Sequence, residues 1–560
     1  MRYRHRSLPL TPYTGPFGTP ELRHLLRRSL FGATVADMAH FNGQSLAQVV
    51  DELLAYTNNT TPPIKAYSNL DGLGNPDPTL IDPDVPFGTT WINTVRIPGQ
   101  PPNPTGPRTK SYQDWWTGLL LEQERNLREK LTLFWYNSMP IQSGAILNAE
   151  LCYTYNQMLR NGSTGNFRQL LYDLTVNGAM LLYLNGYLNI GAAPDENYAR
   201  ELMELFTLGE GSGYTQGDVA EAARLLTGWS VVEESGGNPI LPIVVFNETQ
   251  HDATDKQFGA FFNNTVIQGQ AGPGGGALEI GALLDMIVAN EECSLFVCRQ
   301  LFRWFVHTEI DAAAETDVIV PLAQIFRDNA AAPDQMRIVM QALLTCDHFF
   351  SAEVRGCMVK SPVDLVVGTI RNLRMPLPDA SLFEAQYNVW GDIRGYMADA
   401  GQEVGEAPNV AGWPAYYQQP AFDALWMDSA QYSARKHTWE RLCYLGILTP
   451  MVTVLPQNAN LEYRVDFIAV VQEFSDPGDP NVLVAEAADL LFGVSISQTV
   501  KDQLKVEHLL LGQLSDLYWT VAYATYIADP NTQDPAAQMV PTMLTTLFLA
   551  MQGAAEAQLM

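Results

Sequence analysis

Three glutamates and an arginine stand at helical spacing between Glu196 and Glu204, and these side chains are well suited to acid–base chemistry. In a helix that begins near Asp195, this spacing puts Glu196, Arg200, Glu201 and Glu204 on one face. Paired carboxylates beside an arginine could shuttle protons or hold a cation, with Glu196 and Glu204 as candidate ligands. The alternative, which we favour, is a buried ion-pair network that locks this helix against the next. The cluster lacks the histidines that a transition metal prefers, so we predict no metal site.

The pair His251 and Asp252 is a second place where chemistry is conceivable. A histidine beside a carboxylate could act as a general base with its orienting partner. Adjacent residues seldom face each other, however, so we expect one of the two to cap a loop instead. The sequence contains no GxSxG or HExxH motif, which removes the commonest hydrolase templates.

A third group comprises Asn409 and Trp413, with Gln402 upstream. An exposed asparagine and indole could together bind a sugar or a peptide. The other interpretation, which we favour, is a tight loop held in place by a buried tryptophan. These three residues are therefore candidate binding residues that need a structure to place them.

A helical frame is predicted to position these groups. Apolar residues recur with the helical period over most of the chain. Thr34, Ser45 and Thr215 look like N-terminal caps, and Thr215 with Asp218 resembles a capping box. The pattern predicts helices over 20–31, 112–139, 143–160, 166–184, 195–208, 216–227, 280–289, 294–307, 318–327 and 335–344.

Two segments interrupt the helical pattern. Residues 60–110 contain eleven prolines between Pro62 and Pro107, too many for helix interiors, and predict a long irregular excursion. It could be a lid or an interface arm, but a loop wrapped on the surface is the interpretation we favour. Residues 229–262 change to a strand-like period around Gly236 and Gly237, which predicts a small inserted hairpin.

The composition argues against nucleic-acid-binding and membrane-spanning proteins. The 560 residues carry 33 Lys and Arg against 61 Asp and Glu, a net charge of −28. Such a charge repels phosphate backbones, so nucleic acid is not an expected partner. No apolar run approaches the length of a membrane-spanning helix. No secretory signal is recognisable, which favours the cytoplasm, although an exported protein whose leader lies outside this numbering stays possible.

Residues 195–209 (DENYARELMELFTLG), 213–219 and 221–229 together resemble the bacterial Domain of Unknown Function family 1800. Further landmarks of that family follow in order along nearly the whole chain, at 24–28, 31–32, 129–135, 251–258, 360–362 and 407–414. The family has no established activity, so the resemblance implies a fold and not a function. Its members often neighbour sulfatase-like proteins, which implies such a protein as a partner.

One position departs from the family pattern. After Phe134 and Trp135, relatives commonly carry two histidines, whereas this chain reads Tyr136, Asn137, Ser138 and Met139. If those histidines serve chemistry in relatives, this chain has lost both.

We therefore predict a mainly α protein whose residues 1–560 form one interlocked helical unit, with a small β-hairpin and a long proline-rich loop. The expected function is that of a scaffold or interaction subunit of a larger assembly. The alternatives are a hydrolase or metal-dependent oxidoreductase with a carboxylate-based site, and a cation- or glycan-binding module. No cofactor is predicted.

Overall fold

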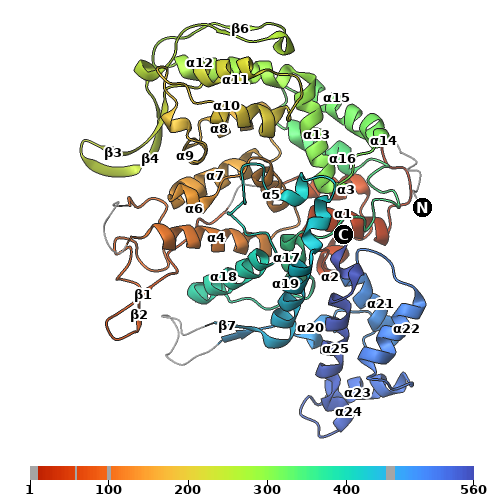
Figure 1. The fold of residues 1–560 in the computed structure, drawn as a ribbon. Coiled ribbons are helices and arrows are strands. Elements are labelled where there is room, and N and C mark those ends of the chain that lie inside the picture. The colour runs from red at the N-terminus through yellow and green to blue at the C-terminus, as the bar shows by residue number, and fades with distance from the viewer. Residues whose placement is uncertain (1–9, 57–59, 97–102, 450–460) are drawn as a thin grey trace.

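The fold is mainly helical, as predicted (Figure 1). A computed structural model describes residues 10–56, 60–96, 103–449 and 461–560. The helices of the first half are α1 (Thr19–Ser29), α2 (Val35–Phe41), α3 (Leu46–Leu53), α4 (Thr105–Leu121), α5 (Arg128–Ser138), α6 (Ser143–Ile146), α7 (Ala149–Gly162), α8 (Phe167–Thr175), α9 (Gly178–Tyr183), α10 (Asn197–Glu201) and α11 (Gln216–Leu225). Those of the second half are α12 (Gly275–Ala289), α13 (Glu291–Phe305), α14 (Ala312–Ala314), α15 (Val320–Asp328), α16 (Gln335–Leu344), α17 (Pro362–Asn372), α18 (Phe383–Asp399), α19 (Ser429–Glu440), α20 (Phe467–Val471), α21 (Pro480–Leu491), α22 (Gln498–Leu504), α23 (Leu517–Ala528), α24 (Pro535–Gln538) and α25 (Val540–Gln552).

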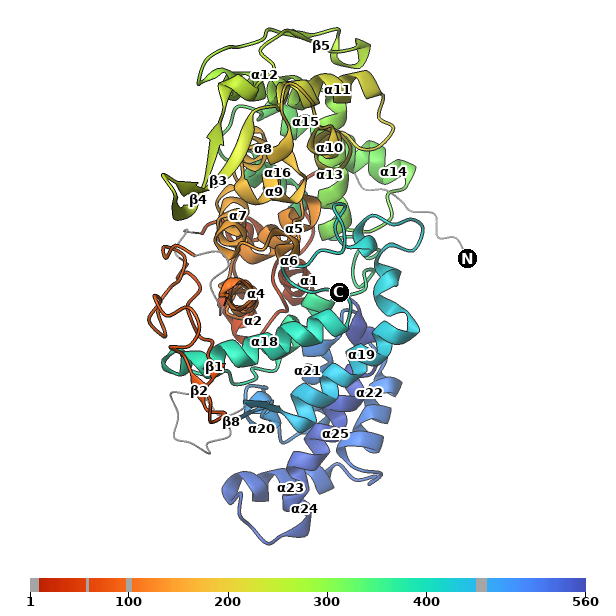
Figure 2. The same cartoon turned by 60° about the vertical axis from the view of Figure 1, so that its left-hand side comes forward.

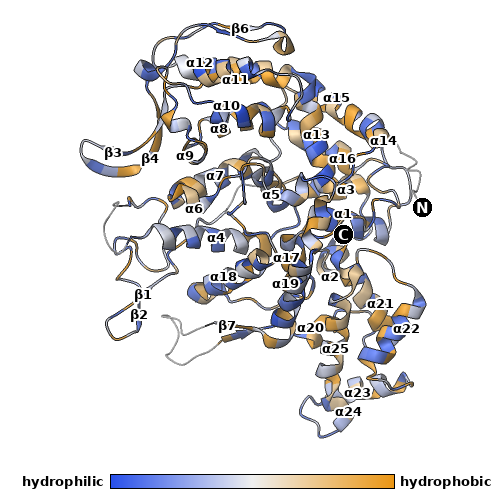
Figure 3. Ribbon diagram, in the orientation of Figure 1, coloured by the Kyte–Doolittle hydropathy of each residue, from blue (hydrophilic) through white to orange (hydrophobic). Residues whose placement is uncertain are grey.

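The apolar stripes of these helices meet in a hydrophobic core whose buried members run from Leu22 to Ala557. The helices carry both hydrophobic and hydrophilic residues, as amphipathic helices do (Figure 3). Trp135 and Trp413, from opposite halves of the sequence, are both fully buried. Among the described residues, each helix is too short or too polar to cross a lipid bilayer.

The predicted N-terminal caps are confirmed. The side chains of Thr34, Ser45 and Thr215 each accept a hydrogen bond from the backbone N–H three residues later. Thr215 also completes a capping box, because its backbone N–H donates a hydrogen bond to the Asp218 carboxylate at 2.7 Å. These caps fix where α2, α3 and α11 begin.

The helix predicted over 112–139 is wrong in one respect, since it is two helices, α4 and α5, separated by a turn. Arg371 donates hydrogen bonds to the carbonyls of Leu121 and Gln123, at 3.1 and 2.8 Å, and so caps the end of α4. Asn126 then accepts from the backbone N–H of Arg128 at 3.1 Å and starts α5. A distant arginine ends the helix, and local periodicity could not reveal it.

The proline-rich excursion is shorter than predicted, because α4 already begins at Thr105. It contains a small antiparallel pair, β1 (Asn69–Leu70) and β2 (Pro76–Asp77). Its buried residues hold it against the helices: Asp82 forms a bidentate ion pair with Arg108 of α4, with N–O distances of 2.6 and 2.7 Å. Residues 97–102 lie outside the described residues.

The predicted hairpin is confirmed as β3 (Trp229–Ser235) and β4 (Asn238–Phe246), paired antiparallel with Trp229 opposite Phe246. Gly236 and Gly237 both have positive φ, +59° and +79°, which the tight two-residue turn requires. Two further pairs were not predicted: β5 (Lys256–Gln257) with β6 (Val266–Ile267), and β7 (Ile447–Thr449) with β8 (Leu461–Tyr463).

Helices α20 to α25 gather at one end of the molecule, below the other helices in Figures 1 and 2. Side chains from the N-terminal part reach this lobe: Arg27 of α1 donates to the carbonyls of Asp489 and Leu490, at 2.7 and 3.2 Å. The chain then returns to the centre, where the N–H of Met560 donates to Met358 at 2.9 Å. That the whole chain acts as one unit stays a prediction.

Candidate functional site

The segment with the glutamates forms α10, which continues into a π-helical turn at Leu202–Thr207. The wider turn arises because the backbone N–H of Leu208 bonds the carbonyl of Met203, five residues back, at 2.8 Å. Thr207 reinforces it by donating its hydroxyl to the carbonyl of Leu202 at 2.6 Å. Such turns often occur at functional sites, because they displace side chains from regular helical positions.

Arg200 does not clamp the two inner glutamates. Its guanidinium pairs with Glu196 at 2.9 Å and donates to Gln216 at the start of α11 at 3.0 Å. Gln216 donates in turn to Glu196 at 2.5 Å. The network does join α10 to the next helix, as the structural interpretation proposed, but Arg200 and Glu196 are 38% and 37% exposed. An exposed pair of this kind contributes at most about 1 kcal/mol.

Glu201 and Glu204 are left as a half-buried pair. In the described part of the chain, neither carboxylate has an ion pair or a hydrogen bond. Burial, and then the neighbouring Glu204 carboxylate, raise the pKa of Glu201, against the opposing effect of Arg200. Burial and Glu204 likewise raise the pKa of Tyr214 to about 12. A carboxyl whose pKa is raised beside a second carboxylate is suited to proton transfer.

A further carboxylate that the sequence did not single out is Glu406, whose charge acts on Tyr183 as that of Glu201 does. Burial, and then the charges of Glu406 and Glu201, raise the pKa of Tyr183, so this tyrosine lies near both carboxylates. The Oε1 atom of Glu406 accepts hydrogen bonds from Ser143, the backbone of Gly144 and Gln113, at 2.7, 2.7 and 2.8 Å. In the sequence, the feature that points to Glu406 is its position directly before the family-like segment 407–414.

The loop with the candidate binding residues is mostly buried. Gln402 is fully buried, and its side-chain oxygen accepts from the backbone of Val363 at 3.1 Å. Trp413 is 1% exposed, and its backbone N–H donates to Asn137 of α5 at 3.0 Å. Asn409 alone is exposed, where it donates to the hydroxyl of Tyr417 at 3.0 Å. This geometry fits a packed loop better than an open asparagine–tryptophan binding surface.

Position 136, where relatives carry a histidine, holds the buried Tyr136. Its hydroxyl donates to the carbonyl of Ile141 at 2.5 Å. Its ring lies 6.2 Å from that of Trp413, so tyrosine packs this helix end against the loop.

The side chains of the neighbours His251 and Asp252 bind different partners. The ring nitrogens of His251 lie 3.0 Å from the carbonyl of Thr227 and 3.0 Å from Glu279 of α12. Asp252 instead accepts from Arg224 at 2.8 Å and from the backbone of Thr254 at 3.0 Å. Although burial opposes it, these hydrogen bonds hold the pKa of Asp252 well below its usual range. Asp252 therefore caps the loop, and the histidine's carboxylate partner is a residue 28 positions away.

Glu279 is the centre of a buried cluster. Its carboxylate contacts His251, pairs with Lys256 at 2.5 Å and accepts from the backbone of Gln270 at 2.6 Å. The side chains of His251, Lys256 and Glu279 are 1%, 0% and 0% exposed. A buried carboxylate with three donors is satisfied, which is the signature of a structural cluster.

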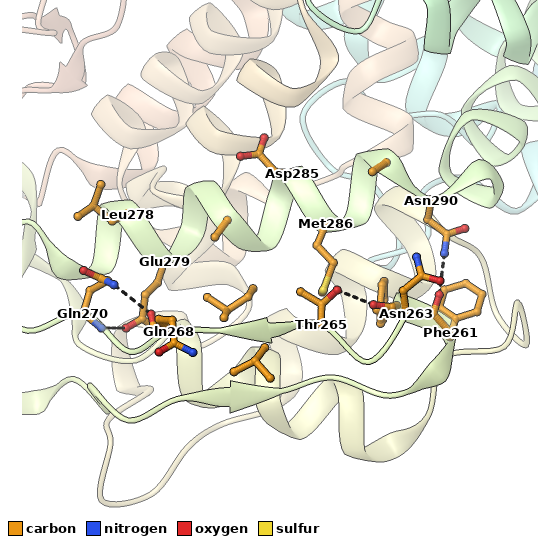
Figure 4. Close-up of a pocket in the computed structure, with 15 residues that line it drawn as sticks. Phe261, Asn263, Thr265, Gln268, Gln270, Leu278, Glu279, Asp285, Met286 and Asn290 are labelled. Carbon is orange, nitrogen blue, oxygen red and sulfur yellow. Dashed lines mark hydrogen bonds between the residues drawn. The ribbon is translucent and has the colours of Figure 1, made fainter.

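Glu279 also lies at one end of a hollow of about 690 Å³ between α12 and the β5–β6 segment (Figure 4). The hollow is lined by apolar side chains such as Leu278 and Met286, with amides at both ends. Glu201, Glu204, His251 and Asn409 are not among its lining residues. A second, open hollow of about 1010 Å³ lies between α7, α8 and β4, and it too is lined by other residues.

Over the described ranges, the histidine, cysteine, aspartate and glutamate side chains do not gather in any group of three or more that could hold a metal ion. The candidate site is therefore the Glu201–Glu204 pair, whose charges raise the pKa of Tyr183 and Tyr214. It is a set of carboxyl and phenol groups suited to proton transfer.

The fold and this signature segment define a large, mainly helical protein built around α10 and its π-helical turn. The family model described as "Protein of unknown function (DUF1800)" matches residues 24–510, and the chain belongs to that family. No curated protein and no solved structure matches the chain.

Proposed function

We propose that this protein is an assembly subunit that pairs with a second copy of itself through helix α23. The observation that carries the proposal is the exposed apolar face of α23, at the end of the molecule formed by the C-terminal lobe (Figure 2). This is the interaction role expected from the sequence, now attached to a particular surface.

The inner face of α23 is firmly held. Trp519 is fully buried and donates its indole N–H to the carbonyl of Pro477 at 2.9 Å. Thr520 donates to the carbonyl of Gly478 at 2.8 Å, and Tyr523 stacks on Trp519 at 5.2 Å. The helix is therefore a fixed part of the lobe, and its outer face points to solvent.

The outer face carries apolar residues with the heptad spacing of a coiled-coil seam. Leu517 and Val521 are 68% and 61% exposed, and Leu514, just before the helix, is 87% exposed. Ala524 and Ala528 continue the stripe and are also exposed. A helix that is apolar on both faces is normally covered on both, so this seam is expected to have a partner.

The sequence of the seam favours a second copy as the partner. In an antiparallel pairing centred on Val521, this residue meets its own copy, and Leu517 of one copy lies level with Thr525 of the other, beside Ala524. The leucine therefore meets smaller residues, as a self-complementary two-fold interface allows. The helix also contains no charged residue, so two chains of net charge −28 can approach along it without bringing like charges into contact.

The test is a cysteine at the centre of the seam. Because Val521 lies at the proposed two-fold axis, Val521→Cys should form a disulfide between two copies under mild oxidation. Leu73→Cys is the matched control, since Leu73 is 88% exposed but lies on the proline-rich excursion. The native cysteines are buried apart from the partly exposed Cys357, so the unmodified chain reports the background. Equal cross-linking of Val521→Cys and Leu73→Cys would contradict the proposal.

A second candidate function, acid–base or cation chemistry at Glu201 and Glu204, is favoured by one observation. In the described residues these two half-buried carboxyls lie together, and neither forms an ion pair. Such a pair can exchange a proton, or bind a cation that supplies the missing positive charge.

This candidate is tested with calcium or manganese alone, by calorimetric titration, and by elemental analysis of the purified protein. Glu204→Gln should abolish any cation binding, while Glu196→Gln, which changes an exposed glutamate already paired with Arg200, should leave it intact. A protein that contains no metal and gives no binding heat would remove the cation form of this candidate. The glycan-binding alternative has no comparable observation in its favour.

A further inference from the structure

Positively charged side chains gather where α1, α5, α17 and α19 meet, although the protein as a whole is strongly acidic. Arg28, Lys130 and Arg435 are at most 1% exposed, Arg27 is 9% exposed, and Lys360 is partly buried beside them. Burial, followed by the charge of Arg27, lowers the pKa of Lys360 to about 7, with Arg435 acting in the same direction. These cations therefore lie close enough to repel one another.

The carboxylates that face this group are already used: Asp489, whose charge acts on Arg27, pairs with Arg23 at 3.2 Å, and Asp364 has partners on both of its oxygens. One of its oxygens pairs with Lys130, and the other accepts from the hydroxyl of Ser361 at 2.8 Å. Within the described ranges, Arg27 donates to carbonyls at the end of α21, and Lys360 donates to the carbonyls of Ala557 and Leu491, at 2.7 and 3.3 Å. Carbonyls and the negative end of a helix offset part of a positive charge, but not two whole charges.

A small cavity lies between these cations. Arg27, Lys360 and Asp364 line it, together with Gln552 of α25, and its volume of about 20 Å³ holds one group of the size of a water molecule. Two glycines, Gly32 and Gly368, also line it. A dry cavity of this kind is normally apolar, whereas this one is polar and charged.

Gln552 provides an independent sign that something occupies the cavity. Gln552 is 2% exposed, and its side-chain Nε2 has no hydrogen-bond partner among the described residues. A buried donor without an acceptor costs about 1–3 kcal/mol in a folded protein, so native proteins almost always supply an acceptor. Met560 also lines the cavity, but within the described ranges it forms no salt bridge with Arg27 or Lys360.

We propose that this cavity binds one small monovalent anion, of the size of chloride, held by the ammonium of Lys360, the guanidinium of Arg27 and the side-chain amide of Gln552. Polyatomic anions such as phosphate or sulfate are too large for the space. The anion would balance the charge at the junction between α1, α17 and the C-terminal lobe, so its role is to stabilise that junction.

The solution test compares chloride with gluconate at constant ionic strength. A ligand that binds only the folded state raises its stability with each tenfold increase in concentration, so the unfolding temperature should rise with chloride and not with gluconate. Gln552→Leu should remove most of this rise, because it deletes one donor while keeping the residue's bulk. Lys360→Met should remove it as well, and Lys436→Met, at an exposed lysine of α19, should not.

The increase in unfolding temperature with chloride should also depend on pH. The groups that face Lys360 are Arg27 from α1, Asp364 from α17 and Arg435 from α19, and of the cations Lys360 has the lowest pKa. Chloride favours the protonated ammonium, so the rise should be larger at about pH 6 than at about pH 9.

The direct test is a crystal grown in bromide, whose anomalous scattering marks the anion. A bromide peak in contact with Lys360 and Gln552 establishes the site even if Lys360→Met fails to fold. Ordered water without a bromide peak, or a chloride effect that Gln552→Leu and Lys360→Met leave unchanged, overturns the proposal.

Discussion

At the scale of single residues, burial decides how much a glutamate's ion pair contributes to stability, and the sequence does not show which glutamates are buried. Glu196 and Glu279 both pair with a basic side chain, but Glu196 is 37% exposed and the Glu279 carboxylate is fully buried. Breaking the buried pair strands the ammonium of Lys256 in the interior, whereas breaking the exposed pair lets water replace the partner.

We therefore expect Glu279→Gln to lower the free energy of unfolding by about 3–5 kcal/mol. Glu196→Gln, the same chemical change at an exposed pair, should alter it by no more than about 1 kcal/mol. Urea denaturation of the two variants and the parent protein measures both values. Equal effects of the two substitutions would show that Glu279 does not hold a buried charge in place.

Glu201 gives a prediction about pH. Because its pKa is raised in the folded protein, the folded state holds this proton more tightly than the unfolded chain does. Folding stability therefore falls as pH rises from the ordinary carboxyl pKa through the raised one, and the ionised carboxylate weakens the fold above that window. Glu201→Gln should make the protein more stable at neutral pH, and the gain should vanish below about pH 4. A loss of stability at neutral pH would mean that Glu201 has a cationic partner.

The sequence placed the glutamates on one helix but did not predict their partners. Spacing placed Arg200 on the face of Glu201 and Glu204, yet the π-helical turn begins at Leu202 and changes the positions that follow. Arg200 pairs instead with Glu196, one regular turn earlier. The link between His251 and Glu279 joins residues far apart in the chain, so no local pattern could reveal it. Glu406 was missed for the same reason.

At the scale of elements, apolar periodicity predicted most helices well, and α16 begins and ends where predicted. The errors occur where a distant side chain decides the outcome, as Arg371 does at the end of α4. The loop that carries Trp413 is another element whose conformation depends on a distant contact, because Gly412 packs against the end of α5. A methyl group at Gly412 would lie 2.4 Å from the carbonyl oxygen of Asn137.

Gly412→Ala should therefore destabilise the protein by more than about 3 kcal/mol, through both this overlap and the positive φ of +88°. Gly43→Ala is the matched control, since Gly43 has a similar φ of +80° but open space around it. Gly43→Ala should lower the free energy of unfolding by about 1 kcal/mol, from the backbone conformation alone. Thermal unfolding of the two variants separates the effects, and similar losses would show that the loop does not pack tightly on α5.

At the scale of the whole molecule, the sequence predicts one interlocked unit. The hydrophobic core runs continuously from Leu22 to Ala557, and Arg27 and Asn372 donate hydrogen bonds to carbonyls at the end of α21 in the C-terminal lobe. Such a protein should unfold in one cooperative transition, with equal calorimetric and van't Hoff enthalpies. Two resolved transitions, one of them abolished by deleting the lobe, would instead divide the chain into separate domains.

The central claim is that the exposed seam of α23 joins two copies of the protein, and sedimentation velocity across a range of concentrations tests it most directly. The seam is roughly 18 Å long, shorter than a permanent interface needs, so the association should be reversible. The account predicts a monomer–dimer equilibrium that Leu517→Glu shifts to monomer, because a charge is then buried in the seam, while Leu73→Glu leaves it unchanged. A protein that stays monomeric at every concentration, or a dimer that Leu517→Glu does not weaken, would contradict it.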